Sequence, residues 1–325
     1  MQIAVVALCT FVLALVFGRL LIPALRALKA GQSIREIGPS WHNSKAGTPT
    51  MGGIMFIAAA ILCVVAAGWR SMLAGYRTHL YVLAFALVFG LIGFIDDFVK
   101  VKFKRNLGLT ALQKLVLQLA AAGAYLALLR YNGDLTCDLY IPFWNVSFEI
   151  NWIVYLVFAM FVIVGCVNAV NLTDGIDGLA SGVTLPVMVF FAVTAWTWGK
   201  TTLALLPAAL AGGLAGFLVY NFHPAKVFMG DTGSLFLGGM VCGLAFALDM
   251  PLVLILVGII YIMETVSVIM QVTYFKLTHG KRIFRMTPIH HHFEMGGWSE
   301  EKIFTVFVGI TVLMCILAFI GVSGR

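Results

Sequence analysis

The sequence predicts an all-α integral membrane protein that crosses the bilayer about ten times. Of its 325 residues, 61% are hydrophobic and 11% are charged, whereas soluble domains average about 45–50% apolar and about 25% charged residues. A soluble protein this apolar would expose large hydrophobic patches, so the composition excludes the soluble classes and intrinsic disorder. Only helices or a closed barrel can satisfy backbone groups in hydrocarbon. Apolar runs of about 20 residues without strict alternation favour helices.

Ten apolar stretches have the length of a membrane-spanning helix. The stretch 251–277 would extend about 40 Å as a helix, against a hydrocarbon core of about 30 Å, so we expect it to tilt, kink or project into water. The first stretch lacks a basic flank and a cleavage site, and we expect a retained helix and not a signal peptide. The stretches are 2–24, 51–68, 80–98, 111–129, 152–170, 178–198, 203–220, 234–249, 251–277 and 302–322.

The basic residues indicate which loops face the cytoplasm. Ten crossings place both termini on one side, and the two sets of loops then hold fifteen and five Lys and Arg residues. Because basic residues concentrate in cytoplasmic loops, both termini are predicted to be extracytoplasmic. Topology and attraction to anionic membrane lipid account for the net charge of +7, and nothing indicates a nucleic-acid partner. We treat residues 1–325 as a single transmembrane domain. Its predicted cytoplasmic loops are 25–50, 99–110, 171–177, 221–233 and 278–301.

Five aspartates gather at the predicted cytoplasmic level of the membrane. An ionisable group costs about 2.5–3.5 kcal/mol at the middle of a spanning helix and less near the interface. Snorkelling and pairing with nearby lysines could explain any one of these residues, but they explain the whole set less well. The set therefore indicates a functional site. Its members are Asp96, Asp97, Asp174, Asp177 and Asp231.

The first motif pairs carboxylates with ammonium groups. If the helix before it continues, Asp96, Lys100 and Lys104 repeat at i, i+4 and i+8 on one stripe. Asp97 then points about 100° away. Such an arrangement offers carboxylates to a hard cation or a proton, and ammonium groups to phosphate oxygens.

The second motif repeats a polar residue every third position. Asn168, Asn171, Asp174 and Asp177 could bring amide and carboxylate oxygens together, and the glycines between them let the backbone approach a ligand. A helix cap and turn between two spans is the alternative. We favour function, because a cap does not need four polar groups.

The third motif, 221–234, is predicted to be a loop that leads into a helix. Its glycines, including Gly230, could present backbone N–H groups to an anion while Asp231 binds Mg²⁺. Asn221 opens the motif. Phe228 could stack on a base or pack against lipid-facing neighbours, and the sequence does not separate these roles.

Two further motifs are predicted to add contacts to phosphate or substrate. His290, His291 and His292 cannot share one helix face, so we expect a loop, and zinc lacks further ligands at the usual spacing.

Lys45 and Thr50 precede the second span, with Thr50 as the expected N-cap and the helix start as an anion site. An ordinary Gly-Pro loop is the alternative. Together the five motifs favour Mg²⁺-dependent phosphoryl or prenyl chemistry at the cytoplasmic interface.

These five segments, in this order, resemble the polyprenyl-phosphate N-acetylhexosamine-1-phosphate transferase superfamily, and within it the phospho-N-acetylmuramoyl-pentapeptide transferase (MraY) branch. The resemblance covers essentially the whole chain. It implies a multi-pass enzyme of the bacterial inner (plasma) membrane, often a homodimer, that acts in peptidoglycan synthesis. The implied reaction is UDP-MurNAc-pentapeptide plus undecaprenyl phosphate giving lipid I and UMP, with Mg²⁺.

The resemblance also implies roles for individual residues. Asp231 would ligate Mg²⁺ together with Asn171, and Asp96, Asp97, Asp231 and His290 would form the catalytic set. Asp96 and Asp97 would handle the lipid phosphate as base or orienting group. The implied contacts to phosphate and nucleotide-sugar are Lys45, Thr50, Lys100, Lys104, Lys114, Asn168, Asn171, Asp174, Asp177, Asn221, Phe228, Gly230, Gln271, His291 and His292.

Direct attack of the lipid phosphate on the β-phosphorus is the favoured mechanism. A two-step route through an aspartyl phosphate stays open. A related transferase that loads another N-acetylhexosamine phosphate is the nearest alternative. An intramembrane prenyltransferase would need a second spaced acidic motif. A transporter would place acids near the midplane, whereas these acids cluster at one face.

Overall fold

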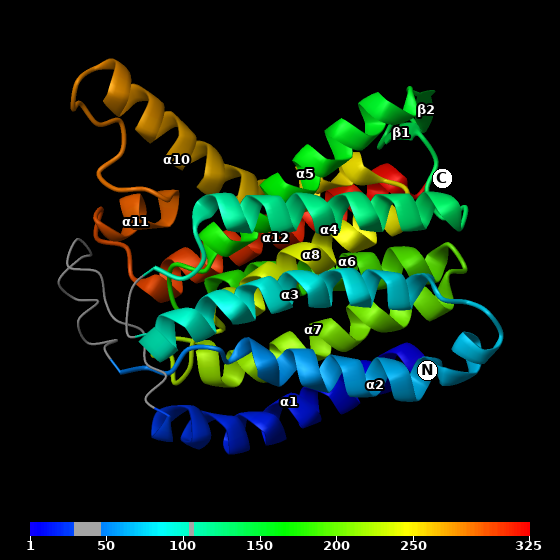
Figure 1. Ribbon diagram of the computed structural model, residues 1–325, viewed down its shortest axis with the longest axis horizontal. Helices are drawn as coiled ribbons and strands as arrows, with labels where there is room; N and C mark the ends of the chain where they lie inside the picture. The colour runs from blue at the N-terminus through cyan, green and yellow to red at the C-terminus, as the bar shows by residue number, and fades with distance from the viewer. Residues whose placement is uncertain (29–46, 104–106) are drawn as a thin grey trace.

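The protein forms a bundle of long apolar helices, seen from the side in Figure 1. The computed structural model describes residues 1–28, 47–103 and 107–325, so Lys45 and Lys104 lie outside the described ranges. Within those ranges, nine helices are long and apolar enough to cross a membrane, and a bent pair would make a tenth span. The chain is therefore an all-α polytopic membrane protein.

The helices follow the predicted spans closely. They are α1 Gln2–Ala27, α2 Gly53–Leu73, α3 Thr78–Phe103, α4 Ala111–Tyr131, α5 Trp152–Thr173, α6 Leu179–Thr197, α7 Thr201–Asn221, α8 Gly230–Ala247, α9 Leu254–Val257, α10 Ile259–Leu277, α11 Ile289–Glu294 and α12 Glu300–Val322. A 3-10 turn, η2, covers Pro251–Val253, and an antiparallel hairpin joins α4 to α5 through β1 Asp138–Ile141 and β2 Val146–Glu149.

The long stretch 251–277 is broken, as its length predicted. The segments Pro251–Val257 and Ile259–Leu277 meet at an angle of 82°. Gly258 lies at the break, where a residue without a side chain allows the sharp change of direction. Beyond it, α10 projects away from the other helices at the upper left of Figure 1.

Helix α8 occupies the centre of the bundle. Every residue from Thr232 to Ala247 is buried, which fits a helix that is apolar or small-sided all round. Its packing against α3 and α5 is close because glycines face those helices: a Cβ on Gly238 would lie 2.6 Å from Val167 Cα, and one on Gly239 would lie 3.1 Å from Ala86 Cα. Small residues allow this approach between membrane helices. The start of α8 is thereby fixed relative to the ends of α3 and α5.

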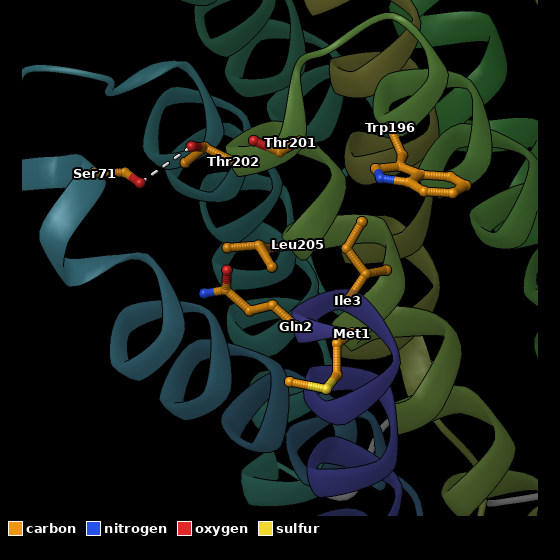
Figure 2. Close-up of a pocket in the computed structure, with 8 residues that line it drawn as sticks. All are labelled: Met1, Gln2, Ile3, Ser71, Trp196, Thr201, Thr202 and Leu205. Atoms are coloured by element: carbon orange, nitrogen blue, oxygen red, sulfur yellow. Dashed lines mark hydrogen bonds between the residues drawn. The ribbon is translucent and has the colours of Figure 1, made fainter.

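The chain ends and the polar motifs lie at opposite ends of the bundle. Figure 1 marks N and C toward the right, whereas α11 and the start of α4 lie toward the left. A cavity of about 160 Å³ lies beside the N-terminus, lined by Met1, Gln2, Ser71 and Trp196 among others, with Thr202 donating to Ser71 across 3.2 Å (Figure 2). That cavity is remote from the polar motifs.

We expect a methyl group to have opposite effects at two helical glycines. Gly212 of α7 faces the Ala7 carbonyl of α1 in direct contact, whereas a Cβ on Gly165 of α5 would meet nothing within 4 Å. Gly212→Ala should lower the free energy of unfolding by about 1–3 kcal/mol through overpacking. Gly165→Ala should leave it unchanged or raise it by up to about 1 kcal/mol, because alanine favours helix. Thermal unfolding of both variants in detergent measures the difference, and equal midpoints would contradict the α1–α7 packing.

Candidate active site

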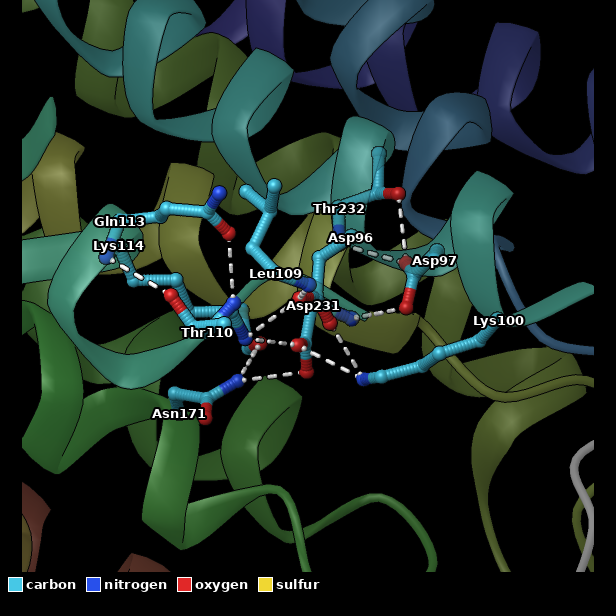
Figure 3. A network of polar contacts seen from close by, with 11 residues as sticks. Asp96, Asp97, Lys100, Leu109, Thr110, Gln113, Lys114, Asn171, Asp231 and Thr232 are labelled. Atoms are coloured by element: carbon cyan, nitrogen blue, oxygen red, sulfur yellow. Dashed lines mark hydrogen bonds and ion pairs between the residues drawn. The ribbon is translucent and has the colours of Figure 1, made fainter. Parts of the chain in front are cut away.

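Asp231, in the first turn of α8, lies at the centre of a polar network drawn in Figure 3. Its Oδ2 accepts hydrogen bonds from Lys100 Nζ at 3.0 Å and from Lys114 Nζ at 2.8 Å. Its Oδ1 accepts from Asn171 Nδ2 at 3.0 Å. Four helices, α3, α4, α5 and α8, thus meet at one carboxylate, and a helix N-terminus stabilises negative charge there.

Asp96 shares both lysines with Asp231. Its side chain is fully buried, with Lys100 Nζ 2.6 Å from Oδ2 and Lys114 Nζ 3.1 Å from Oδ1. The Leu109 N–H also donates to Oδ1 at 2.6 Å. The predicted continuation of the helix holds, because α3 runs to Phe103 and carries Asp96 and Lys100 on one stripe.

Asp97 points away from the lysines and holds the beginning of α8. Its carboxylate accepts the backbone N–H groups of Asp231 at 3.2 Å and Thr232 at 2.9 Å, and the Thr232 hydroxyl at 2.7 Å. The side chain is 4% exposed. A carboxylate bound to free N–H groups at a helix N-terminus is a strong contact, and here it comes from another helix.

Gly230 makes this contact possible. Its φ is +71°, and a Cβ there would lie 2.5 Å from Asp97 Oδ2 and 2.7 Å from Thr50 Oγ1. Only glycine fits that position without strain. Thr50 therefore lies beside the start of α8, but its predicted capping of α2 is wrong. The N-cap of α2 is Gly52, and no side chain caps it.

The second motif divides between two places. Asn171 Nδ2 reaches Asp231 and also Ser234 Oγ at 2.7 Å. Asn168, one turn earlier in α5, donates to Gln118 Oε1 at 2.8 Å and lies against α4. A spacing of three in a helix rotates successive side chains about 60° short of a full turn, so the four polar groups do not share one line.

Asp174 and Asp177 lie in the turn after α5, beyond the helix. Burial, together with the negative charges of Asp231, Asp97 and Asp177, raises the pKa of Asp174 to about 8. Asp177 forms a separate cluster: its Oδ2 lies 3.0 Å from His223 Nδ1, and its N–H donates to Glu300 Oε2 at 3.0 Å. That cluster joins the turn to the α7–α8 loop and to α12.

The third and fifth motifs lie side by side. Phe228 N–H donates to the Pro49 carbonyl, and Gly52 N–H donates to the Phe228 carbonyl, both at 2.8 Å. Asn221 is 1% exposed; its amide accepts from Ser181 and donates to the Val227 carbonyl. The structure therefore places Asn221 as a support of the α7–α8 loop.

The histidines form a short helix, so the predicted loop is wrong. All three lie in α11, where their side chains still point in different directions. His290 Nδ1 lies 3.0 Å from Glu264, His291 Nδ1 lies 2.8 Å from Glu294, and His292 Nδ1 accepts from the Arg285 N–H. Pro288 is the N-cap of this helix and has an extended conformation.

Gln271 supports the segment that leads to α11. Its Oε1 accepts the N–H groups of Ile283 at 3.0 Å and Phe284 at 2.9 Å. Beside it lies a pocket of about 550 Å³, lined by Phe275, Lys276, Arg282, Arg285 and Met295 among others.

The carboxylates of the network fit a metal ion. Asp96, Asp97 and Asp231 each offer an oxygen within 4.8 Å of the others. These three carboxylates outnumber the two ammonium groups of Lys100 and Lys114 in the described part of the site. A divalent cation would neutralise the excess negative charge, and oxygen ligands suit a hard cation such as Mg²⁺.

Several residues of the network were missed from the sequence. Thr232 and Ser234 lie one and three residues after Asp231. Their closeness to Asp231 in the chain could have identified them as candidates. Glu264 is an acidic residue inside an apolar stretch, and an ionisable residue in such a stretch could have indicated a functional role. Gln118, His223 and Glu300 carried no spacing that would predict their partners.

Comparisons with known proteins agree with the resemblance predicted from the motifs. Residues 79–249 match the family described as glycosyl transferase family 4, and residues 45–57 match signature 1 of phospho-N-acetylmuramoyl-pentapeptide-transferase. The phospho-N-acetylmuramoyl-pentapeptide-transferase of Clostridium beijerinckii is 48% identical over 312 residues, covering 96% of this chain and 94% of the relative. That of Caldanaerobacter subterraneus is 47% identical over 323 residues, covering 99% of each. The chain therefore belongs to the phospho-N-acetylmuramoyl-pentapeptide-transferase family, within glycosyl transferase family 4.

Proposed function

We propose that this protein transfers phospho-MurNAc-pentapeptide from UDP-MurNAc-pentapeptide to undecaprenyl phosphate, giving lipid I and UMP in peptidoglycan synthesis. The observation that carries the proposal is the meeting of Asp231 with Lys100, Lys114 and Asn171 at the start of α8. Family membership supplies the reaction, and this constellation supplies groups that suit it. A transfer between two phosphates needs cations to reduce repulsion between anions.

Asp231 and Asn171 would hold Mg²⁺ in this protein. When bound, Mg²⁺ would polarise the diphosphate and stabilise charge that develops on the leaving UMP. Asn171 donates to Asp231 here, and its amide oxygen is the group that would face a cation.

Lys100 and Lys114 would bind phosphate oxygens. Each ammonium group contacts both Asp96 and Asp231, so the lysines are held in place before substrate arrives. A lysine carries three donors and acts on phosphate as a point charge. Asp96 would keep both lysines oriented if Asp231 held a metal ion.

Asp97 would act by positioning. Three donors of α8 already bind its carboxylate, which suits it to hold the start of that helix in place. A phosphate group with a second pKa of about 6 is mostly dianionic at neutral pH and needs no strong base. These points support direct attack on the β-phosphorus over a covalent aspartyl intermediate.

We further propose ten crossings of the bacterial inner membrane, with the α9–α10 pair as the ninth. The site end would face the cytoplasm and both termini the outside, as the distribution of basic residues favours. A homodimer, implied by the family resemblance, completes the proposal.

Loss of the central carboxylate should abolish turnover. Asp231→Asn should lower the rate of Mg²⁺-dependent UMP release by at least about 1,000-fold, in the range of other preorganised electrostatic groups. The protein should stay folded, because Asp96 still pairs with both lysines. Asp138→Asn, in the hairpin at the other end, is the matched control and should keep wild-type activity. Normal turnover by Asp231→Asn would remove this residue from the site.

Two lysines on one helix should differ sharply. Lys100→Gln should lower kcat/KM for undecaprenyl phosphate by at least about 10-fold, the effect of losing a hydrogen bond to a charged group. Lys102→Gln should change it less than about two-fold, because Lys102 lies over the rings of Phe98 and Phe103 and makes a weak exposed contact. Steady-state UMP release with varied lipid acceptor measures both variants. Equal losses would argue for a general effect of surface charge.

Removal of one donor to Asp97 should weaken the start of α8. Thr232→Val should lower the free energy of unfolding by about 1.5–3 kcal/mol, because the Asp97 carboxylate loses a buried hydrogen bond. Thr232→Ser keeps the hydroxyl and should unfold close to the wild-type midpoint. Thermal unfolding in detergent compares the two, and an unshifted midpoint for Thr232→Val would contradict the capping role of Asp97.

A further inference from the structure

A buried carboxylate–imidazole pair lies beneath the turn that follows α5. The side chains of Glu264 in α10 and His290 in α11 are fully buried. His290 Nδ1 lies 3.0 Å from Glu264 Oε2, and the His290 backbone N–H points to the same oxygen at 3.5 Å. Glu264 therefore fixes one ring nitrogen and the first turn of α11 at once.

Such a pair is costly to keep in an apolar bundle. A carboxylate in a membrane helix is unfavourable even when paired, and a buried ion pair is often no more stable than apolar side chains of the same volume. Apolar side chains could fill the contact between α10 and α11, and Ile289, next to His290 in the chain, is itself buried. The retained carboxylate therefore points to a role beyond packing.

The other nitrogen of the ring is directed at the catalytic side of the turn. His290 Nε2 is buried and has no hydrogen-bond partner among the described residues. A Cβ on Gly175 would lie 2.5 Å from His290 Cε1 and closer still to Nε2. Gly175 itself is exposed and directly follows Asp174. His290 Nε2 therefore lies against the exposed Gly175, in the turn that carries Asp174.

We propose that Glu264 is a positioning residue, which accepts the hydrogen of His290 Nδ1 and so presents Nε2 to an anionic oxygen of the nucleotide-sugar substrate. The inference rests on the proposed function and adds a residue to it. With substrate bound, Nε2 takes up a second proton from water and donates it in a hydrogen bond to that oxygen, and the Glu264 carboxylate is the counter-ion of the ring. A carboxylate that orients a histidine in this way recurs in metal sites and hydrolases. The exposed Gly175 turn shifts aside on binding.

Three variants test this inference by steady-state UMP release. Glu264→Gln and His290→Asn should each lower kcat/KM for UDP-MurNAc-pentapeptide by at least about 10-fold. Asparagine keeps a donor for Glu264, which protects the fold. The double variant should lose no more than His290→Asn alone, because Glu264 acts through the ring. Thr265→Val is the matched control: its buried hydroxyl has no partner, and the variant should keep wild-type activity.

The ring itself can be observed without turnover. In protein labelled with ¹⁵N-histidine, His290 is identified by its absence in His290→Asn. The wild-type spectrum should show hydrogen on Nδ1, and Glu264→Gln should lose that preference. Addition of UDP-MurNAc-pentapeptide without lipid acceptor should shift the wild-type Nε2 signal and leave the signal in Glu264→Gln unshifted.

Defined outcomes would overturn the inference. Additive losses in the double variant, wild-type kcat/KM in Glu264→Gln, or an Nε2 signal that ignores substrate each contradict it. If Glu264→Gln does not fold, Gly175→Ala decides, because its methyl group would overlap the His290 ring and move it while Glu264 and His290 are both kept; full activity of Gly175→Ala contradicts the inference. Absence of UMP release from the wild type would instead refute the proposed function. The ¹⁵N spectrum would still show whether His290 Nδ1 carries a hydrogen, so the two failures can be distinguished.

Discussion

The site depends on one contact between two helices: the Asp97 carboxylate at the N-terminus of α8. It accepts hydrogen bonds from two backbone N–H groups and a hydroxyl. These bonds fix both the rotation of α8 about its axis and its position along that axis relative to α3. That rotation places Asp231 between Lys100 and Lys114. The contact is close because Gly230 has no side chain, and because Gly93 of α3 lies directly against the Asp231 carbonyl. Packing of small residues and capping of a helix thus act together.

The charges around Asp231 hold the site together through contacts within the protein. Asp96 is fully buried, and a buried carboxylate needs charged partners. Lys100 and Lys114 supply them and bridge to Asp231, whose side chain is 19% exposed. Both lysines are thus shared by two carboxylates of unequal burial. Under the proposed function, a cation at Asp231 would release the lysines on their exposed side while Asp96 still held them, and metal binding and phosphate binding would then be coupled through these shared partners.

Apolar length and charge placement were sufficient to predict the helices and the gathering of acids at one end. The stripe of Asp96 and Lys100 also followed from helical spacing alone. Side-chain direction beyond a helix end could not be predicted, since no period applies there: Asp177 turns to His223 and Glu300, far along the chain. The spacing of the second motif could not predict that Asn168 donates to Gln118 of α4, because that contact depends on how the two helices pack. The α11 helix escaped prediction because six residues carry too little periodicity to distinguish a helical turn from a loop.

Glu264 shows what the motifs alone leave out. The sequence identifies His290 as a candidate residue. The orientation of its ring is set by Glu264, which lies in an apolar stretch 26 residues earlier in the chain. The break at Gly258 tilts α10 so that this acid faces the bundle, while the far end of the helix carries the exposed Leu277 away from it. The kinked helix thus brings this acid together with α11 beside the Gly175 turn.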